Sequence, residues 1–341
     1  MNRLSRRQFL GTAGAATLAG QPSGATPRLA LACADYLRFT PLATGDVRPK
    51  GFDLTWVRGP RNEMLRRASS DPEIGGGEAS MLQHLLRVDQ GDRSLVAVPV
   101  FLLRNFPARD IYRRKGSSLT PSDLNGRRIG IYNWAASGAV WYRHFLRYLE
   151  QDPAKMKWVV GGADAAGRVD SRGPFPSHVE HAPAGRSLSD LLLAGEIEAF
   201  FAPIPPSKHD AVEGPIVRLF PDFPSIEKRY FEETRCYPPQ HLLVLREEVW
   251  ERDPSIGKPL VAMFDECERK FLENQHLFPY ASPWLIAEVE ETDRVMGREY
   301  FAQGLEKNRE QLDVFCRSGF EDGLTKRRVT VEEYFAEFFK A

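Results

Sequence analysis

The sequence has little cysteine and no cysteine pair of the kind that binds a metal or cycles between thiol and disulfide. Four cysteines occur among 341 residues, at positions 33, 236, 267 and 316. Their wide separation, without a CxxC spacing, argues against a zinc ribbon and against a dithiol redox centre. An oxidising compartment would permit one disulfide, and the sequence does not select its pair.

The sequence also lacks an excess of charge of either sign. It has 46 basic and 46 acidic residues, and removal of residues 1–25, which hold three arginines and no acid, leaves a formal charge of −3. This balance gives no electrostatic reason to expect a nucleic acid or an anionic membrane as a partner. Internal repeats and low-complexity tracts are absent as well. The remaining 316 residues are enough for a well-buried core and more than one lobe.

The N-terminal segment has the features of an export signal. Residues 5–10 (SRRQFL) contain paired arginines, and residues 11–20 form a small, mildly apolar run that is too short and too glycine-rich to span a bilayer. Residues 23–25 (SGA) offer the small side chains of a cleavage site. We therefore interpret residues 1–25 as a twin-arginine signal peptide and expect a periplasmic mature chain without stable membrane insertion. The alternative is a basic disordered tail.

Helical hydrophobic spacing alternates with short β-rich runs along most of the chain, which is typical of an α/β fold. Residues 28–34 are predicted to form the first strand, with Cys33 buried in it. Asp35 and Arg38 follow this strand, at the edge where an open α/β sheet presents its ligand loops. The planar guanidinium of Arg38 can bind both oxygens of a carboxylate, and a surface arginine explains the same pattern.

Two further candidates, Glu78 and Ser80, stand immediately before a predicted amphipathic helix over residues 81–88. They can cap that helix or face a ligand. Residues 95–103 form an almost continuous apolar run, which predicts a buried strand that leads to a second lobe. The loop after it holds two arginines that are candidates for pairing with an anion, Arg104 and Arg109.

Residues 120–146 combine a strand, a loop of small residues and a helix start. The strand is predicted over residues 127–132 and the helix over residues 139–150. Free N–H groups at the beginning of a helix carry the positive end of its dipole, and small side chains let an anion approach them. Ser137 and Gly138 are therefore candidate anion ligands. The alternative is an ordinary strand-to-helix connection.

Histidines and a tryptophan add candidates of other kinds. His178, Glu180 and His181 lie in a Gly- and Pro-rich segment that fixes no tetrahedral geometry, so we predict no metal site, and we predict no cofactor either. His241 follows a proline turn and can bind a carboxylate, transfer a proton near neutral pH, or serve as a hydrogen-bonded structural histidine. Trp141 can pack in the core or stack on a ligand.

Several segments together resemble the 4,5-dihydroxyphthalate decarboxylase family, a branch of the type II periplasmic-binding-protein-like superfamily that also contains ABC-transporter solute receptors. The resemblance covers nearly all of residues 29–335. Its most specific segments are ADYLRFTPL (34–42), EAS (78–80), VAVPVFLLRNF (96–106), PSDLNGRRIGI (121–131), AVWYR (139–143), GEIEAFFAPIPP (195–206), VRLFPDF (217–223), YPPQHLLVLREEV (237–249) and GLTKRRVTVEEYF (323–335).

This resemblance implies a two-lobed α/β protein with a ligand cleft between the lobes. The expected first lobe comprises residues 26–105 and 207–341 with the C-terminal helices, and the second comprises residues 106–206. The resemblance supports a site role for the candidates that match the family's pattern, which are Asp35, Arg38, Glu78, Ser80, Arg104, Trp141 and His241.

Two departures from the family's pattern bear on activity. Residues 107–109 (PAR) replace an Arg-His-Ser run, and Thr40 replaces an arginine. The first hypothesis is therefore a periplasmic protein that binds a small organic anion of the aromatic carboxylate type for delivery to an ABC-type permease. The second is a lyase that decarboxylates a hydroxylated aromatic carboxylate, with His241 or a protonated Glu78 as the proton donor.

Overall fold

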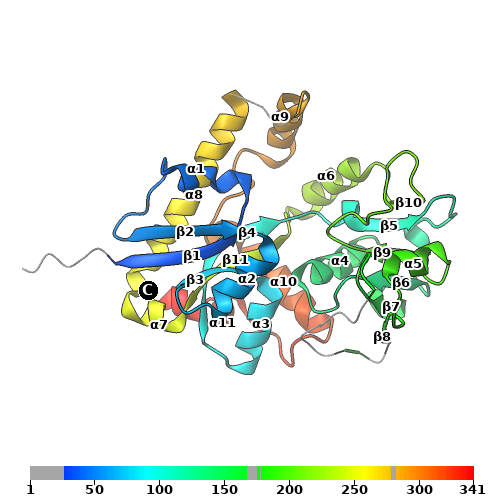
Figure 1. The fold of residues 1–341 in the computed structure, drawn as a ribbon, viewed down its shortest axis with the longest axis horizontal. Helices are drawn as coiled ribbons and strands as arrows, with labels where there is room; N and C mark the ends of the chain where they lie inside the picture. The colour runs from blue at the N-terminus through cyan, green and yellow to red at the C-terminus, as the bar shows by residue number, and fades with distance from the viewer. Residues whose placement is uncertain (1–26, 167–174, 177, 278–281) are drawn as a thin grey trace, which may run out of the picture.

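The computed structural model describes residues 27–166, 175–176, 178–277 and 282–341, so the predicted signal peptide lies outside the described residues. Two β-sheets stand at the two ends of the molecule, each with helices packed around it (Figure 1). This two-lobed α/β architecture confirms the fold class expected from the sequence.

The first sheet has the strand order β2-β1-β3-β11-β4. β1 is parallel to both of its neighbours, whereas β11 runs antiparallel between β3 and β4. Its strands are β1 (Arg28–Ala34), β2 (Asp53–Gly59), β3 (Gly76–Ser80), β4 (Leu95–Arg104) and β11 (Pro239–Arg246). Gly77 has a φ of +153°, and a Cβ there would overlap the carbonyl oxygen of Ala32. Glycine is therefore required where β3 approaches β1, directly before Glu78.

The second sheet has the order β10-β5-β9-β6-β7-β8. β6 is parallel to β9 and β7, and β5 runs antiparallel to β9 and β10. Its strands are β5 (Ile111–Arg114), β6 (Arg128–Ile131), β7 (Lys157–Val160), β8 (Val179–His181), β9 (Ala199–Phe201) and β10 (Ile216–Arg218).

The chain leaves the first sheet after β4 and returns to it at β11, so two crossings join the sheets. The lobe boundaries at residues 105 and 206 stay a prediction. β10 lies after the second of these positions and belongs to the second sheet.

Helices connect the strands and extend the C-terminal part of the chain (Figure 1). They are α1 (Thr40–Thr44), α2 (Arg61–Ser70), α3 (Met81–Gln90), α4 (Ser137–Tyr148), α5 (Leu188–Leu193), α6 (Phe223–Thr234), α7 (Glu247–Arg252), α8 (Gly257–Leu277), α9 (Leu285–Met296), α10 (Arg309–Glu321), α11 (Val331–Tyr334) and α12 (Ala336–Lys340).

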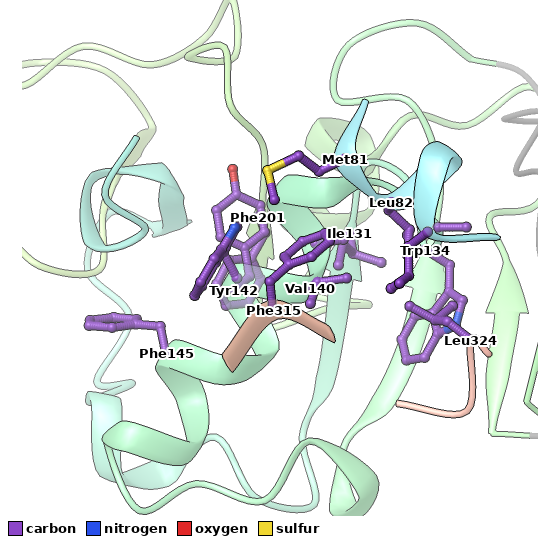
Figure 2. Close-up of a cluster of buried hydrophobic side chains, with 14 of the residues drawn as sticks. Met81, Leu82, Ile131, Trp134, Val140, Tyr142, Phe145, Phe201, Phe315 and Leu324 are labelled. Carbon is purple, nitrogen blue, oxygen red and sulfur yellow. The ribbon is translucent and has the colours of Figure 1, made fainter. Parts of the chain in front are cut away.

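The hydrophobic core is continuous between the lobes. Figure 2 shows side chains of α3, α4 and α10 in one buried cluster, with Met81, Val140 and Phe315 among them. A buried ion pair lies beside it, in which Nε of Arg143 donates to Asp322 at 2.6 Å and both side chains are at most 1% exposed. The C-terminal helix α10 therefore holds α4 of the second lobe against α3 of the first.

Predicted and observed elements agree best for buried strands. The strand predicted over residues 28–34 has the bounds of β1. The helix predicted over residues 139–150 begins two residues earlier, at Ser137. Helix α6 was not predicted from the sequence; Asp222 caps it, and a proline occupies its first turn.

None of the described helices is long and apolar enough to cross a bilayer. All four cysteines are buried and unpaired, and Cys33 is a buried residue of β1. Within the described ranges, no group of three or more His, Cys, Asp or Glu side chains is placed to hold a metal ion.

Candidate functional site

A glutamate and a histidine meet where β3 lies against β11. In the register of these strands His241 pairs with Ser80 and Leu243 pairs with Glu78, so Glu78 and His241 are diagonal neighbours on one face of the sheet. Nδ1 of His241 lies 2.5 Å from Oε1 of Glu78. The Glu78 side chain is fully buried, whereas 13% of the His241 side chain is exposed. The histidine therefore connects a buried carboxylate to the protein surface.

The surroundings of Glu78 hold it as a carboxylate. The N–H of Ala34 donates to Oε2 at 2.8 Å, and the hydroxyl of Tyr36 donates to Oε1 at 2.6 Å. Burial favours the neutral acid, but the hydrogen bonds and charge of its donors outweigh burial and lower the pKa of Glu78 below its ordinary value. Because a carboxylate only accepts, Nδ1 of His241 carries the proton. Nε2 has no hydrogen-bond partner among the residues that the structure describes.

Tyr36 links this pair to an arginine. Burial and the neighbouring charge of Glu78 raise the pKa of Tyr36 far above its ordinary value, so Tyr36 stays a phenol and donates. Cζ of Arg61 lies 6.0 Å from the centroid of the Tyr36 ring. The positive charge of Arg61 opposes the rise in pKa of Tyr36 and also that of Tyr132, which directly follows β6 of the second sheet. Arg61 is therefore within electrostatic reach of both lobes.

The first turn of α4 meets the first lobe at two serines. Oγ of Ser80 lies 2.8 Å from Oγ of Ser137, which also accepts from the N–H of Leu82 at 3.0 Å. Ser80 caps α3, which is one of the two roles that the sequence allowed it. A Cβ on Gly138 would lie 2.9 Å from the hydroxyl of Tyr132, and no side chain caps the N-terminus of α4. Ser80, Ser137 and Gly138 thus lie together where the lobes touch.

Two candidate arginines are buried in bonds to the protein itself. Nε of Arg38 donates to Glu268 at 2.9 Å, and the Arg38 guanidinium lies 5.0 Å from the centroid of the Tyr36 ring. Arg104 donates to the side chain of Asn308 at 2.5 Å, and burial lowers the pKa of Arg104 to about 10. These bonds tie β4 and the segment after β1 to the C-terminal half of the chain.

Three other candidates lie outside the Glu78–His241 group. Asp35 is exposed and pairs with Arg58 at 3.3 Å. Arg109 is exposed beside Asp110, at 3.4 Å. Trp141 is fully buried and donates from its indole nitrogen to a main-chain carbonyl oxygen at 2.6 Å. A ligand-binding role for these residues stays a prediction.

Three residues around the junction of the lobes were not among the candidates predicted from the sequence: Tyr36, Arg61 and Tyr132. Tyr36 follows β1, Arg61 follows β2 after one proline, and Tyr132 follows β6. Ligands of open α/β sheets bind beyond the carboxyl ends of the strands, so the position of each residue within two residues of a strand end was the available signal.

The fold is that of the type II periplasmic binding proteins. The periplasmic aliphatic sulphonate binding protein SsuA from Escherichia coli superposes with a TM-score of 0.53 over 91% of this chain and 92% of that protein, at 14% sequence identity. No family model matches the chain.

Sequence relatives identify the family. The 4,5-dihydroxyphthalate decarboxylase of Comamonas testosteroni is 28% identical over 318 residues, which are 90% of this chain and 96% of that protein. The 4,5-dihydroxyphthalate decarboxylase of Pseudomonas putida is 32% identical over 187 residues, which are 52% of this chain and 71% of that protein. The chain belongs to the 4,5-dihydroxyphthalate decarboxylase family, as its sequence segments predicted.

Proposed function

We propose that this protein is a non-oxidative carboxy-lyase that removes CO2 from a hydroxylated aromatic carboxylate, with 4,5-dihydroxyphthalate as the first substrate to test. The Glu78–His241 pair carries the proposal, because a buried carboxylate orients an imidazole whose Nε2 is unpaired among the described residues. A receptor needs donors for its anion, whereas a carboxylate behind a histidine serves proton transfer. The names of the two relatives support the same activity.

The proposed reaction exchanges one bond for another at a single ring carbon. The ring hydroxyl that is para to the departing carboxylate releases electron density toward the ring carbon that carries this carboxylate. Nε2 of doubly protonated His241 donates its proton to that carbon, and a C–H bond forms. The C–C bond to the carboxylate then breaks, its electron pair returns to the ring, and CO2 leaves. Glu78 stabilises the imidazolium before the transfer, and water returns the proton to the imidazole afterwards.

Of the two proton donors that the sequence offered, the hydrogen bonding supports His241. The lowered pKa of Glu78 keeps it ionised near neutral pH, so it has no proton to give. Its role in the proposal is to position His241. Tyr36 donates to the same carboxylate oxygen, which fixes that oxygen from the other side.

Incubation of the purified mature chain with 4,5-dihydroxyphthalate tests the proposed activity. We expect equal amounts of CO2 and 3,4-dihydroxybenzoate, over many turnovers and without an added oxidant. Product at the level of an enzyme-free control would contradict the proposal.

A second candidate function is capture of the ligand without turnover. The paired arginines of residues 5–10 and the fold shared with a periplasmic sulphonate-binding protein favour it. The lobes would then close on an aromatic carboxylate and present it to an ABC-type permease. A calorimetric binding isotherm for 4,5-dihydroxyphthalate, obtained without any product, would support this function instead of the lyase.

For either function we propose export through the twin-arginine pathway and a periplasmic location. Replacement of both Arg6 and Arg7 by lysine should leave the protein in the cytoplasmic fraction and unprocessed. Unchanged periplasmic recovery of that variant would contradict this export route.

A further inference from the structure

Arg61 is an exposed arginine whose charge is not neutralised by an acidic side chain among the residues that the structure describes. It begins α2, directly after Pro60, and no described residue forms an ion pair or hydrogen bond with its guanidinium. Three other arginines near the junction differ from it, because each donates to an acidic or amide side chain: Arg38, Arg104 and Arg143. The guanidinium of Arg61 is therefore available to an anion.

Three carboxylates belong to the surroundings of Tyr36 and Tyr132, and each is bound elsewhere: Asp35 precedes Tyr36, Glu78 accepts from it, and the charge of Asp110 acts on Tyr132. Glu78 accepts from His241, Tyr36 and a main-chain N–H. Asp35 pairs with Arg58. Asp110 is buried and accepts hydrogen bonds from two neighbouring side chains. An incoming carboxylate thus meets an unneutralised cation at Arg61.

We propose that Arg61 binds the second carboxylate of an aromatic vicinal dicarboxylate and so makes the site select dicarboxylates over monocarboxylates. The inference rests on the proposed function in placing the substrate ring beside His241. Tyr36 supplies the geometry, because its hydroxyl shares Oε1 of Glu78 with His241 and its ring lies 6.0 Å from Cζ of Arg61. Tyr36 thus neighbours both the histidine pair and the arginine, and the proposal places the substrate ring next to it.

The two carboxylates of such a ligand have different fates. The one beside His241 leaves as CO2, and the one at Arg61 stays on the ring. A planar guanidinium can hold both oxygens of that second carboxylate, which fixes the ring in one orientation. Because this interaction is present before and after the chemical step, Arg61 is a specificity-determining residue that affects KM more than kcat.

Calorimetry with two inert ligands tests this role. Phthalate carries two adjacent carboxylates and benzoate one, and neither has the ring hydroxyl that the reaction needs. Arg61→Ala should weaken phthalate binding by about tenfold or more and change benzoate binding by less than about twofold. Arg61→Lys keeps the charge but not the planar guanidinium, so its affinity for phthalate should lie between those of the wild type and Arg61→Ala. Arg66→Ala is the matched control, since Arg66 is also exposed on α2 and has no ion pair with a described residue.

The outcomes separate this inference from the proposed function. Equal losses for phthalate and benzoate in Arg61→Ala, no loss for either, or no binding of phthalate by the wild type would overturn the role of Arg61. If the selective loss occurs but 4,5-dihydroxyphthalate is not decarboxylated by the wild type, the lyase proposal fails and the role of Arg61 stands. If the wild type decarboxylates it and Arg61→Ala shows no selective loss, the lyase proposal stands and the role of Arg61 fails.

Discussion

Replacement of Glu78 by glutamine probes the hydrogen-bonded group on which the proposed chemistry depends. The amide oxygen can still accept from the N–H of Ala34, but the amide NH2 then faces the two groups that donate in the wild type, Tyr36 and His241. A phenol can rotate and an imidazole can change tautomer, so the net loss corresponds to one charge-assisted bond. We expect the free energy of unfolding to fall by about 1.5–3 kcal/mol at pH 7.

Catalysis should suffer more than stability. With glutamine at position 78, the tautomer that satisfies the amide leaves Nδ1 of His241 unprotonated, and the imidazolium loses the carboxylate that stabilises it. General acid catalysis contributes about 100- to 10,000-fold, so we expect kcat to fall by at least about 100-fold. Glu63→Gln, at an exposed position on α2, is the control for both measurements.

The stability loss should depend on pH in a definite direction. The folded-state pKa of Glu78 is lowered, so its contribution is fully present above the unfolded carboxyl pKa of about 4.3 and is lost as the pH falls through the folded value. Urea unfolding should therefore show the full difference between wild type and Glu78→Gln at about pH 5.5, and a narrowing difference below about pH 4.3. Equal stability of the two proteins at pH 7 would refute the reasoning.

Two further substitutions test the packing that joins the lobes. Asp322→Asn leaves Arg143 buried without its counter-charge and should lower the free energy of unfolding by about 3–5 kcal/mol in urea titrations. The control Asp313→Asn, on the helix α10 that Asp322 directly follows, should cost less than about 0.5 kcal/mol. Trp141→Phe loses the indole hydrogen bond and some packing, so it should cost about 1–3 kcal/mol and leave the affinity for phthalate unchanged. A drop in phthalate affinity at unchanged stability would show that Trp141 contacts the ligand.

Local sequence patterns predicted several strands and helix starts well, because strands and helix caps depend on residues that are neighbours in the sequence. Strand β1 and the capped start of α3 at Ser80 follow from hydrophobic alternation and a capping side chain, which act within one or two turns of chain. The two lobes and the family were predicted from segments spread over the whole chain. The helix α6 was not predicted, although Phe223, Ile226 and Tyr230 repeat at helical spacing and Asp222 caps its start.

The use of each arginine could not be predicted, because it depends on partners far away in the sequence. Arg38 pairs with Glu268, 230 positions later, and no local pattern around Arg38 indicates that partner. The pairing of Glu78 with His241 likewise joins residues 163 positions apart through the register of β3 and β11. The sequence made Glu78 and His241 separate candidates, and only the pairing of β3 with β11 shows that their side chains are hydrogen-bonded to each other.

The most direct test of the proposed activity compares kcat for release of CO2 from 4,5-dihydroxyphthalate between wild type and His241→Gln. Glutamine keeps a polar side chain at the position but cannot donate a proton as an imidazolium does. We predict turnover by the wild type, a loss of at least about 100-fold in His241→Gln, and wild-type kcat in the control His276→Gln on α8. Wild-type kcat in His241→Gln, or no CO2 from the wild-type protein, would contradict the account.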